Sequence, residues 1–211
     1  MAHAQIAGDP ALSRLMTTST VELFYAILAS LAFAFVATLL VIRLLAFASA
    51  SARGWYRTIG AFVEPNAVGM AFWVALLATM GSLYFSEVAR FDPCQLCWYQ
   101  RIAMYPLVVI LGIAAVRRDA GVRIYARPLA AIGALIATYH VAFEWIPALD
   151  TGACAAGPSC SAIWFRVFGF ISFPTLALAA FLLIITLLSV RSQDADHGDP
   201  GTDPDADRSP A

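Results

Sequence analysis

Five long apolar stretches, separated by short polar segments, dominate the pattern of residues along this chain. They cover roughly residues 23–46, 67–85, 102–116, 129–145 and 167–190. Apolar runs of about 18 residues or more cross the hydrocarbon of a bilayer as a helix. The third stretch is shorter, but it reaches spanning length if its helix begins near Pro93. The pattern therefore predicts an all-α integral membrane protein with five transmembrane helices.

Composition and charge agree with this prediction. Of the 211 residues, 61% are hydrophobic and 13% are charged, and the mean hydropathy is +0.75. These values lie beyond the usual range of a soluble domain. The net charge of −1 gives no reason to expect a nucleic-acid partner. The partner that the composition indicates is the lipid bilayer.

The chain contains no lysine, so arginine alone sets the predicted orientation. The connections over 47–66 and 117–127 are rich in arginine, whereas those over 86–100 and 147–166 hold one arginine each. Positively charged loops tend to stay in the cytoplasm. We therefore expect the N-terminus and the two arginine-poor loops outside, and the C-terminus inside.

The first apolar stretch has an alternative interpretation as a signal peptide. Residues 46–50, Ala-Phe-Ala-Ser-Ala, resemble a cleavage site with small residues. A signal core, however, has about 7–15 apolar residues, and this stretch is longer. Arg43 interrupts its end, and Arg53 and Arg57 follow the cleavage-like sequence. We expect an uncleaved helix.

All four cysteines lie in the two loops that are predicted to be outside, and the first pair starts a helix. In Asp92-Pro93-Cys94-Gln95, Asp suits the N-cap, Pro suits the first helical position and Gln95 completes a capping box. Cys94 and Cys97 then share the first turn and one face, where the helix dipole lowers the pKa of a thiol. This favours redox chemistry over a structural disulfide. It also favours redox chemistry over a zinc site, because no His/Cys pair at ligand spacing lies nearby in sequence.

Arg101 lies four residues after Cys97 and so on the same helix face. A cation below the membrane interface is costly and is usually functional. It is suited to stabilise the Cys97 thiolate and to hold a carbonyl or anionic oxygen of a bound electron acceptor. The alternative is an arginine that extends back to the outer headgroups.

The second pair is Cys154-Ala-Ala-Gly-Pro-Ser-Cys160. Five intervening residues, with Gly157 and Pro158, make a compact loop that can close a small disulfide and open again. A disulfide that closes so short a loop contributes little in the chain-entropy model, so stability alone is a weak explanation for it.

The residues Cys94-Gln-Leu-Cys97-Trp-Tyr99-Gln-Arg101 resemble the C-x-L-C-x-Y-x-R signature of the disulfide bond formation protein B (DsbB) family. The resemblance covers about 67–190 and implies a four-helix transmembrane bundle. It also implies a protein-disulfide oxidoreductase that passes electrons from Cys94 and Cys97 to a membrane quinone, ubiquinone or menaquinone, without a metal. The partner would be an exported thioredoxin-like thiol oxidase (DsbA-like), and the location the bacterial plasma membrane with the redox loops outside.

For the second pair, the resemblance implies that a partner thiol attacks or bonds Cys154, while Cys160 exchanges with Cys94. The short spacing is closest to the BdbC-like branch of the family. The segment 161–168 suits a helix in the membrane interface, or the start of the last span.

The extra first helix is absent from the family's four-span plan. We therefore divide the chain into an N-terminal extension over 1–66, with one transmembrane helix and a cytoplasmic loop, and a four-helix redox domain over 67–190. The acidic tail over 191–211, rich in Gly and Pro, is predicted to be disordered and cytoplasmic.

His140 and Glu144 share one face of the fourth predicted helix. His140 is expected near the depth of Arg101, where an imidazole can donate a hydrogen bond or a proton to a quinone. The family pattern has a histidine near this position. The alternatives are a packing role for His140 and an interfacial carboxylate for Glu144.

Two other functions remain compatible with the residues. One is a vitamin K epoxide reductase-like oxidoreductase, although in that family the loop cysteines precede the CxxC pair, and here they follow it. The other is a structural membrane protein with two stabilising disulfides, which should resist mild reductant.

Overall fold

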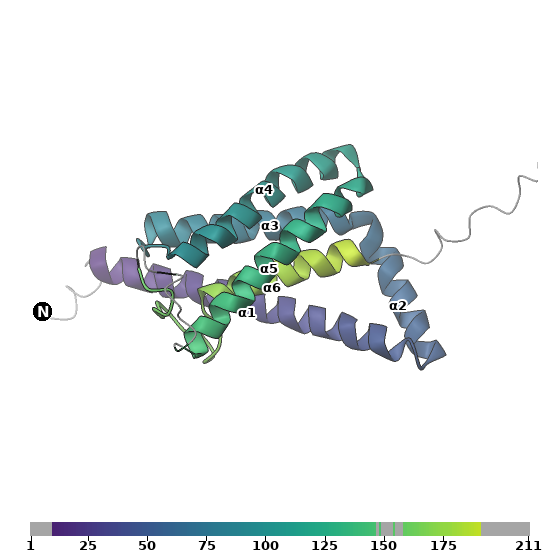
Figure 1. Cartoon of the computed structure of the whole chain (residues 1–211), viewed down its shortest axis with the longest axis horizontal. Coiled ribbons are helices and arrows are strands. Elements are labelled where there is room, and N and C mark those ends of the chain that lie inside the picture. The colour runs from purple at the N-terminus through teal and green to yellow at the C-terminus, as the bar shows by residue number, and fades with distance from the viewer. Residues whose placement is uncertain (1–9, 147, 149–153, 155–157, 191–211) are drawn as a thin grey trace, which may run out of the picture.

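The computed structural model describes residues 10–146, 148, 154 and 158–190. Within this part of the chain the regular elements are helices, apart from one isolated β-bridge (Figure 1). The long helices are α1 (Pro10–Leu45), α2 (Ala50–Val63), α3 (Ala67–Leu83), α4 (Gln95–Arg117), α5 (Arg123–Trp145) and α6 (Phe173–Ser189). Short turns of other helix types link them: Glu64–Asn66, Ala120–Val122 and the π-helical turn Tyr84–Val88.

Four of these helices form a closed bundle. Helix α3 packs against α4 and α6, and α5 also packs against α4 and α6, so the four helices enclose one core. Helix α1 lies outside the bundle along α6 (Figure 1). Four candidate spans have the length and hydropathy to cross a membrane, and α6 is a shorter apolar helix. The prediction of a four-helix membrane bundle with an additional N-terminal helix is confirmed, and the protein is a multi-pass membrane protein.

Small residues allow the helices of the bundle to approach closely. In a membrane, neighbouring helices associate by packing and hydrogen bonds because the lipid is as apolar as their side chains. Helix α5 presents a buried stripe of alanines to its neighbours, and Gly133 lies within that stripe against Phe181. A Cβ atom at Gly133 would lie 2.3 Å from the Phe181 ring, so this contact requires glycine. The buried alanines are Ala126, Ala130, Ala134 and Ala137.

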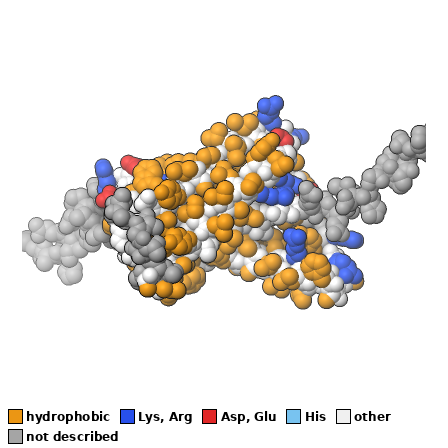
Figure 2. Space-filling view, viewed as in Figure 1, with side chains coloured by type: hydrophobic (Ala, Val, Ile, Leu, Met, Phe, Trp, Pro, Cys, Tyr) orange, Lys and Arg blue, Asp and Glu red, His pale blue; other side chains and the backbone are white. Residues whose placement is uncertain are grey.

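Arginine side chains gather at one end of the molecule, over α2 and the α4–α5 connection (Figure 2). Arg123 pairs with Glu64 at 3.5 Å, and the Nε of Arg127 donates to the Leu188 carbonyl at 3.0 Å. These contacts connect α5 to the turn before α3 and to the end of α6. The segment 158–172 and the start of α4 lie at the opposite end (Figure 1). The separation of arginines from cysteines agrees with the charge pattern of the sequence.

Three local predictions were wrong. The connection 47–66 contains a helix, α2, because its apolar residues recur at helical spacing. Helix α6 begins at Phe173, six residues later than expected, so Pro174 lies in its first turn and does not kink it. The segment 161–168 is not helical: Val167 and Ile171 form an antiparallel bridge around a turn.

We expect Gly133→Ala to lower the stability of the bundle, because overpacking a close contact costs about 1–3 kcal/mol. Thermal unfolding in detergent should show a lower midpoint than in the wild type. Gly69→Ala in α3 is the matched control, because a Cβ atom there meets nothing within 4 Å. Alanine also has the better helix propensity, so the control should be neutral or stabilising. Equal midpoints for the two variants would contradict the packing argument.

Candidate redox site

The first cysteine of the CxxC pair caps helix α4. The helix begins at Gln95, and Cys94 is its N-cap, with its sulfur 3.4 Å from the Cys97 amide. The predicted N-cap at Asp92 and first position at Pro93 were therefore wrong by two residues. Asp92 and Pro93 belong to the extended segment before the helix. The sulfur of Cys94 thus takes the place of a carboxylate oxygen at the positive end of the helix dipole.

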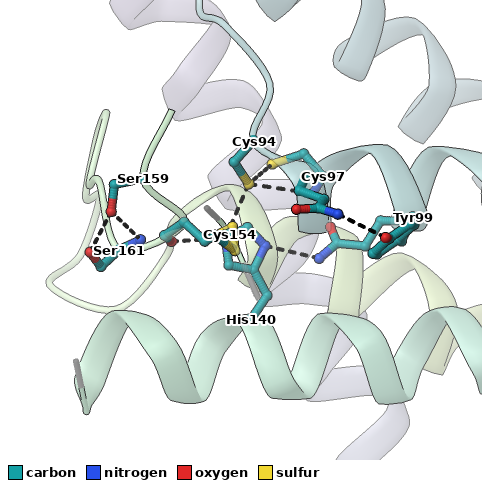
Figure 3. Close-up of a disulfide and its surroundings, with 10 residues drawn as sticks. Cys94, Cys97, Tyr99, His140, Cys154, Ser159 and Ser161 are labelled. Atoms are coloured by element: carbon teal, nitrogen blue, oxygen red, sulfur yellow. Dashed lines mark hydrogen bonds between the residues drawn. A yellow bond between two sulfur atoms is a disulfide. The ribbon is translucent and has the colours of Figure 1, made fainter. Parts of the chain in front are cut away.

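Cys94 is buried in a small cluster that joins three parts of the chain. Its neighbours include Leu96 of α4, Phe143 of α5 and the two loop cysteines. The sulfurs of Cys94 and Cys97 are 2.9 Å apart, and both cysteines are free thiols. The Nε2 atom of His140 lies 3.7 Å from the Cys94 sulfur. Figure 3 shows Cys94 and His140 approaching the loop disulfide from different helices.

Cys154 and Cys160 form a disulfide, and both are buried. The sulfurs of Cys94 and Cys160 and a ring nitrogen of His140 all lie within 4.8 Å of one another. Cys160 is part of a disulfide and is not a thiolate, so the set offers only Cys94 and His140, fewer than the three or four protein ligands of a zinc site. The arrangement instead suits the attack of one sulfur on the other, the geometry required for thiol–disulfide exchange.

The surroundings of Cys94 favour its thiolate. The hydrogen bond from the Cys97 thiol contributes most, and the hydrogen bond and charge of His140 and the Cys97 amide add to it. Together they outweigh burial and lower the pKa of Cys94 from its ordinary value of 9.0 to about 4. From the sequence we expected Arg101 to stabilise a thiolate at Cys97. In the structure the donors converge on Cys94.

His140 is held by a glutamine that the sequence analysis did not single out. The Cys160 carbonyl, 3.1 Å from Nε2, can only accept, so Nε2 carries the proton. On the other side of the ring, the buried Gln100 amide lies 3.0 Å from Nδ1. Its NH₂ group donates to neutral histidine, and its oxygen can accept from the protonated ring. The sequence did contain a signal for this contact, because Gln100 is a polar residue within an apolar spanning helix.

A cavity of about 250 Å³ is lined by residues of α1, α3, α4 and α6. Its lining, as far as the structure describes the chain, is mostly apolar. The other lining side chains are Cys97, Gln100, Arg101, Asp92, Ser82, Ser86, Tyr25 and Tyr105. His140 is not among these lining residues. The structure therefore brings Cys97 and Arg101 to one cavity, as their spacing indicated, and places His140 with the other cysteines.

Arg101 is fixed at the rim of this cavity. Its Nε and Nη2 atoms donate to the hydroxyl and carbonyl oxygens of Ser82 at 2.9 and 3.0 Å. Its guanidinium also lies over the Trp98 ring, 5.2 Å from the centroid. These contacts hold the charge of Arg101 beside Cys97 and the cavity. Ser82, at the end of α3, is the second residue that sequence reasoning missed.

Aromatic rings close the cavity at the cysteine end of the bundle. Phe85 stacks on Phe91 and Phe165 and meets Phe173 edge-on, with centroids 4.9–6.2 Å apart. The cluster joins the π-helical turn after α3, the segment before α4 and the loop before α6. It therefore fixes the two loops that carry the cysteines relative to each other.

Comparisons with known proteins agree with this site. The family model for disulfide bond formation protein DsbB matches residues 64–190. Disulfide bond formation protein C of Bacillus subtilis (strain 168) is 51% identical over 120 residues, which cover 56% of this chain and 87% of the relative. Probable disulfide formation protein C 2 of Bacillus anthracis is 46% identical over 123 residues, 58% of this chain and 88% of the relative. No solved structure matches the chain.

The lowered pKa of Cys94 predicts a distinctive pH dependence. With Cys154→Ser and Cys160→Ser to remove exchange, the ultraviolet absorbance of the Cys94 thiolate should persist in mildly acidic solution and disappear as the pH falls through about 4. The thiolate should also stabilise the folded state. This contribution should be fully present above pH 9.0, the ordinary pKa of cysteine, and should be lost as the pH falls through the folded-state pKa of about 4.

The control for this titration replaces the main donor. Cys97→Ala should move the Cys94 transition to higher pH, because the hydrogen bond that contributes most is removed. Cys97→Ser keeps a donor and should fall between the two. A Cys94 transition near 9.0 in the protein that retains Cys97 would contradict the assignment.

Proposed function

Because the chain belongs to the DsbB family, and is therefore a thiol–disulfide oxidoreductase of disulfide bond formation, we propose that it reoxidises an exported thioredoxin-like dithiol protein and passes the electrons to membrane quinone. The family assignment decides against a vitamin K epoxide reductase-like protein. The observation that carries the proposal is the position of the Cys94 sulfur. It lies 2.9 Å from Cys97 and within 4.8 Å of Cys160, so it can exchange electrons with both.

The first step takes place at the loop disulfide. A thiolate of the reduced partner attacks Cys154, a mixed disulfide forms, and Cys160 leaves as a thiolate. Cys160 attacks Cys94 of an oxidised Cys94–Cys97 pair, and Cys97 leaves as a thiolate. The partner's second thiolate resolves the mixed disulfide, so that the partner departs oxidised and Cys154 is free. Because Cys154 is buried, the loop must move for the partner to reach it.

The second step returns the loop to its starting state. Cys154 attacks Cys160 in the Cys94–Cys160 bond, which restores the loop disulfide and releases Cys94. A thiol of low pKa leaves faster, so the donors around Cys94 favour this step. The two electrons of the partner then lie on Cys94 and Cys97 as a thiolate and a thiol, one proton has gone to solvent, and the loop disulfide is closed again.

We assign His140 to the exchange between Cys94 and Cys160, because its Nε2 lies near both residues. It orients the Cys94 sulfur and can carry a proton between the two thiols as they exchange. Gln100 keeps the ring in position in either protonation state. This replaces the role in quinone binding that the sequence analysis gave to His140.

The cavity beside Cys97 fits a quinone. A quinone needs a donor for a carbonyl oxygen and apolar space for its ring and tail, and Arg101 and the apolar lining supply these. Once bound, a quinone supplies an acceptor for two electrons and two protons. Cys94 and Cys97 then close to a disulfide, which returns the CxxC pair to the oxidised state that Cys160 attacks.

The arginine-rich end of the bundle faces the cytoplasm in this proposal, and the cysteine end lies on the outer face of the bacterial plasma membrane. Residues 67–190 form the redox domain, and residues 1–66 add α1 and α2. The tail over 191–211, which we expect to be a disordered cytoplasmic extension, lies outside the described residues.

Replacing Cys154 should separate the two half-reactions. We expect Cys154→Ser to stop oxidation of a reduced thioredoxin-like partner, because the attacked sulfur is absent. Chemically reduced Cys94 and Cys97 should still reduce a soluble quinone analogue, which is followed by quinone absorbance. Ser159→Ala, in the same loop, is the control and should retain both reactions. Normal partner turnover by Cys154→Ser would exclude this relay.

Arg101→Met should weaken quinone binding. Losing one hydrogen bond from a charged group costs about 1.5–3 kcal/mol, so we expect the apparent Michaelis constant for quinone to rise about 10- to 100-fold. Arg101→Lys should recover part of the loss, since it restores the charge without the planar fork.

The control for Arg101 is Arg166→Met. Arg166 lies over the Trp145 ring at 4.7 Å and is not among the described residues that line the cavity. The measurement is steady-state quinone reduction with the partner saturating. An unchanged quinone dependence in Arg101→Met would leave Arg101 with no part in binding the acceptor.

A further inference from the structure

One wall of the cavity beside Cys97 comes from α1, which lies outside the residues matched to the family. Tyr25, Leu28, Ala29 and Ala32 of this helix all line the cavity. Their spacing places them on one helix face. On the opposite face, Phe24, Ile27 and Leu31 are exposed, as lipid-facing side chains should be. The helix therefore has a cavity face and a lipid face.

Contacts with α6 and α3 fix the cavity face of α1 in place. Ala26, Ala29 and Ala32 are buried in one cluster with Ala179 of α6, and these small residues bring the two helices close together. Against α3, the Tyr25 hydroxyl donates to the Leu77 carbonyl at 3.1 Å.

Gly81 of α3 makes room for the Tyr25 ring. A Cβ atom at Gly81 would lie 2.6 Å from the Tyr25 ring, so α3 has no side chain where the tyrosine sits. The ring also meets Phe85 edge-on, with centroids 5.9 Å apart. The wall is thus a packed part of the molecule and not a helix resting loosely on the bundle.

The chemistry of the cavity identifies its occupant. The redox sulfur of Cys97 and the guanidinium of Arg101 lie at one end, and the side chains of α1, α3 and α6 make the rest mostly apolar. A phospholipid could match the apolar part and offer ester oxygens to Arg101, but it has no group that accepts electrons from a thiol. An aromatic ring with carbonyl oxygens and an apolar tail matches both ends.

We propose that α1 forms part of the quinone-binding site of this protein and determines how tightly the quinone is bound. This inference rests on the proposed transfer of electrons to quinone and adds residues from the N-terminal extension to it. Leu28 contacts the bound quinone from the α1 side, and Tyr25, held by Gly81, sets the distance between α1 and α3.

Two tryptophan variants of α1 test the proposal. Leu28→Trp fills the cavity and should raise the apparent Michaelis constant for a soluble quinone analogue about 10-fold. Leu31→Trp makes the same change three residues along, at a side chain that is 61% exposed, and should leave the constant unchanged. Equal quinone dependence in Leu28→Trp, Leu31→Trp and the wild type would overturn the proposal.

A second pair of variants guards against misfolding. Leu28→Ala removes apolar contact without adding bulk and should raise the same constant about 3- to 10-fold, whereas Leu31→Ala should not. In all four variants, thiol–disulfide exchange between a reduced partner and the oxidised protein in a single turnover without quinone should be normal. Loss of that exchange in the Leu28 variants alone would assign α1 a structural role and overturn the proposal.

A photoreactive quinone analogue gives a direct readout. It should label the α1 peptide around Leu28 in the wild type, and the label should decrease with Leu28→Trp and with excess unlabelled quinone. Label that is displaced by phospholipid and not by quinone would identify a lipid site and overturn the proposal. If the wild type does not reduce quinone at all, the proposed function itself fails, and this result is distinct from a wild type that reduces quinone without α1.

Discussion

The position of the Cys94 sulfur is the constraint on which the rest of the site depends. It caps α4, accepts hydrogen bonds from the Cys97 amide and thiol, and lies within reach of His140 and Cys160. A buried thiolate is unfavourable unless several donors surround it. Those donors come from two helices, and the Cys160 sulfur beside Cys94 comes from the loop before α6. The bundle must therefore bring α4, α5 and this loop together at one end.

Helix α4 contributes residues to both the cysteine cluster and the cavity. Cys94 faces His140 and the loop disulfide, and Cys97, one turn further along, lines the cavity with Arg101. The sulfurs of Cys94 and Cys97 are only 2.9 Å apart, so they join the cysteine cluster to the cavity. The two polar residues are distributed in the same way. Arg101 lines the cavity, and His140 lies beside Cys94 and Cys160.

The scaffold achieves this with small side chains, because helices in lipid gain little from the hydrophobic effect alone. Gly133 admits the Phe181 ring within the bundle, and Gly81 admits Tyr25 between α1 and α3. The contact of Gly133 with Phe181 packs α5 against α6 within the bundle. The contact of Gly81 with Tyr25 packs α1 against α3 at the cavity. Both require glycine in a helix interior, where it lowers local stability. Close packing against an aromatic ring offsets that cost.

The sequence by itself determined the membrane class, the helical spans, the separation of arginines from cysteines and the pairing of Cys97 with Arg101. These follow from local periodicity and from spacing within one helix. Tertiary structure alone decided that His140 lies beside Cys94 and Cys160, that Gln100 and Ser82 contact His140 and Arg101, and that α1 lines the cavity. Each of these contacts joins separate helices, and helical spacing specifies which residues share a face but not which neighbour that face meets. The start of α6 was misplaced for the same reason, because Phe173 packs into an aromatic cluster drawn from three distant segments.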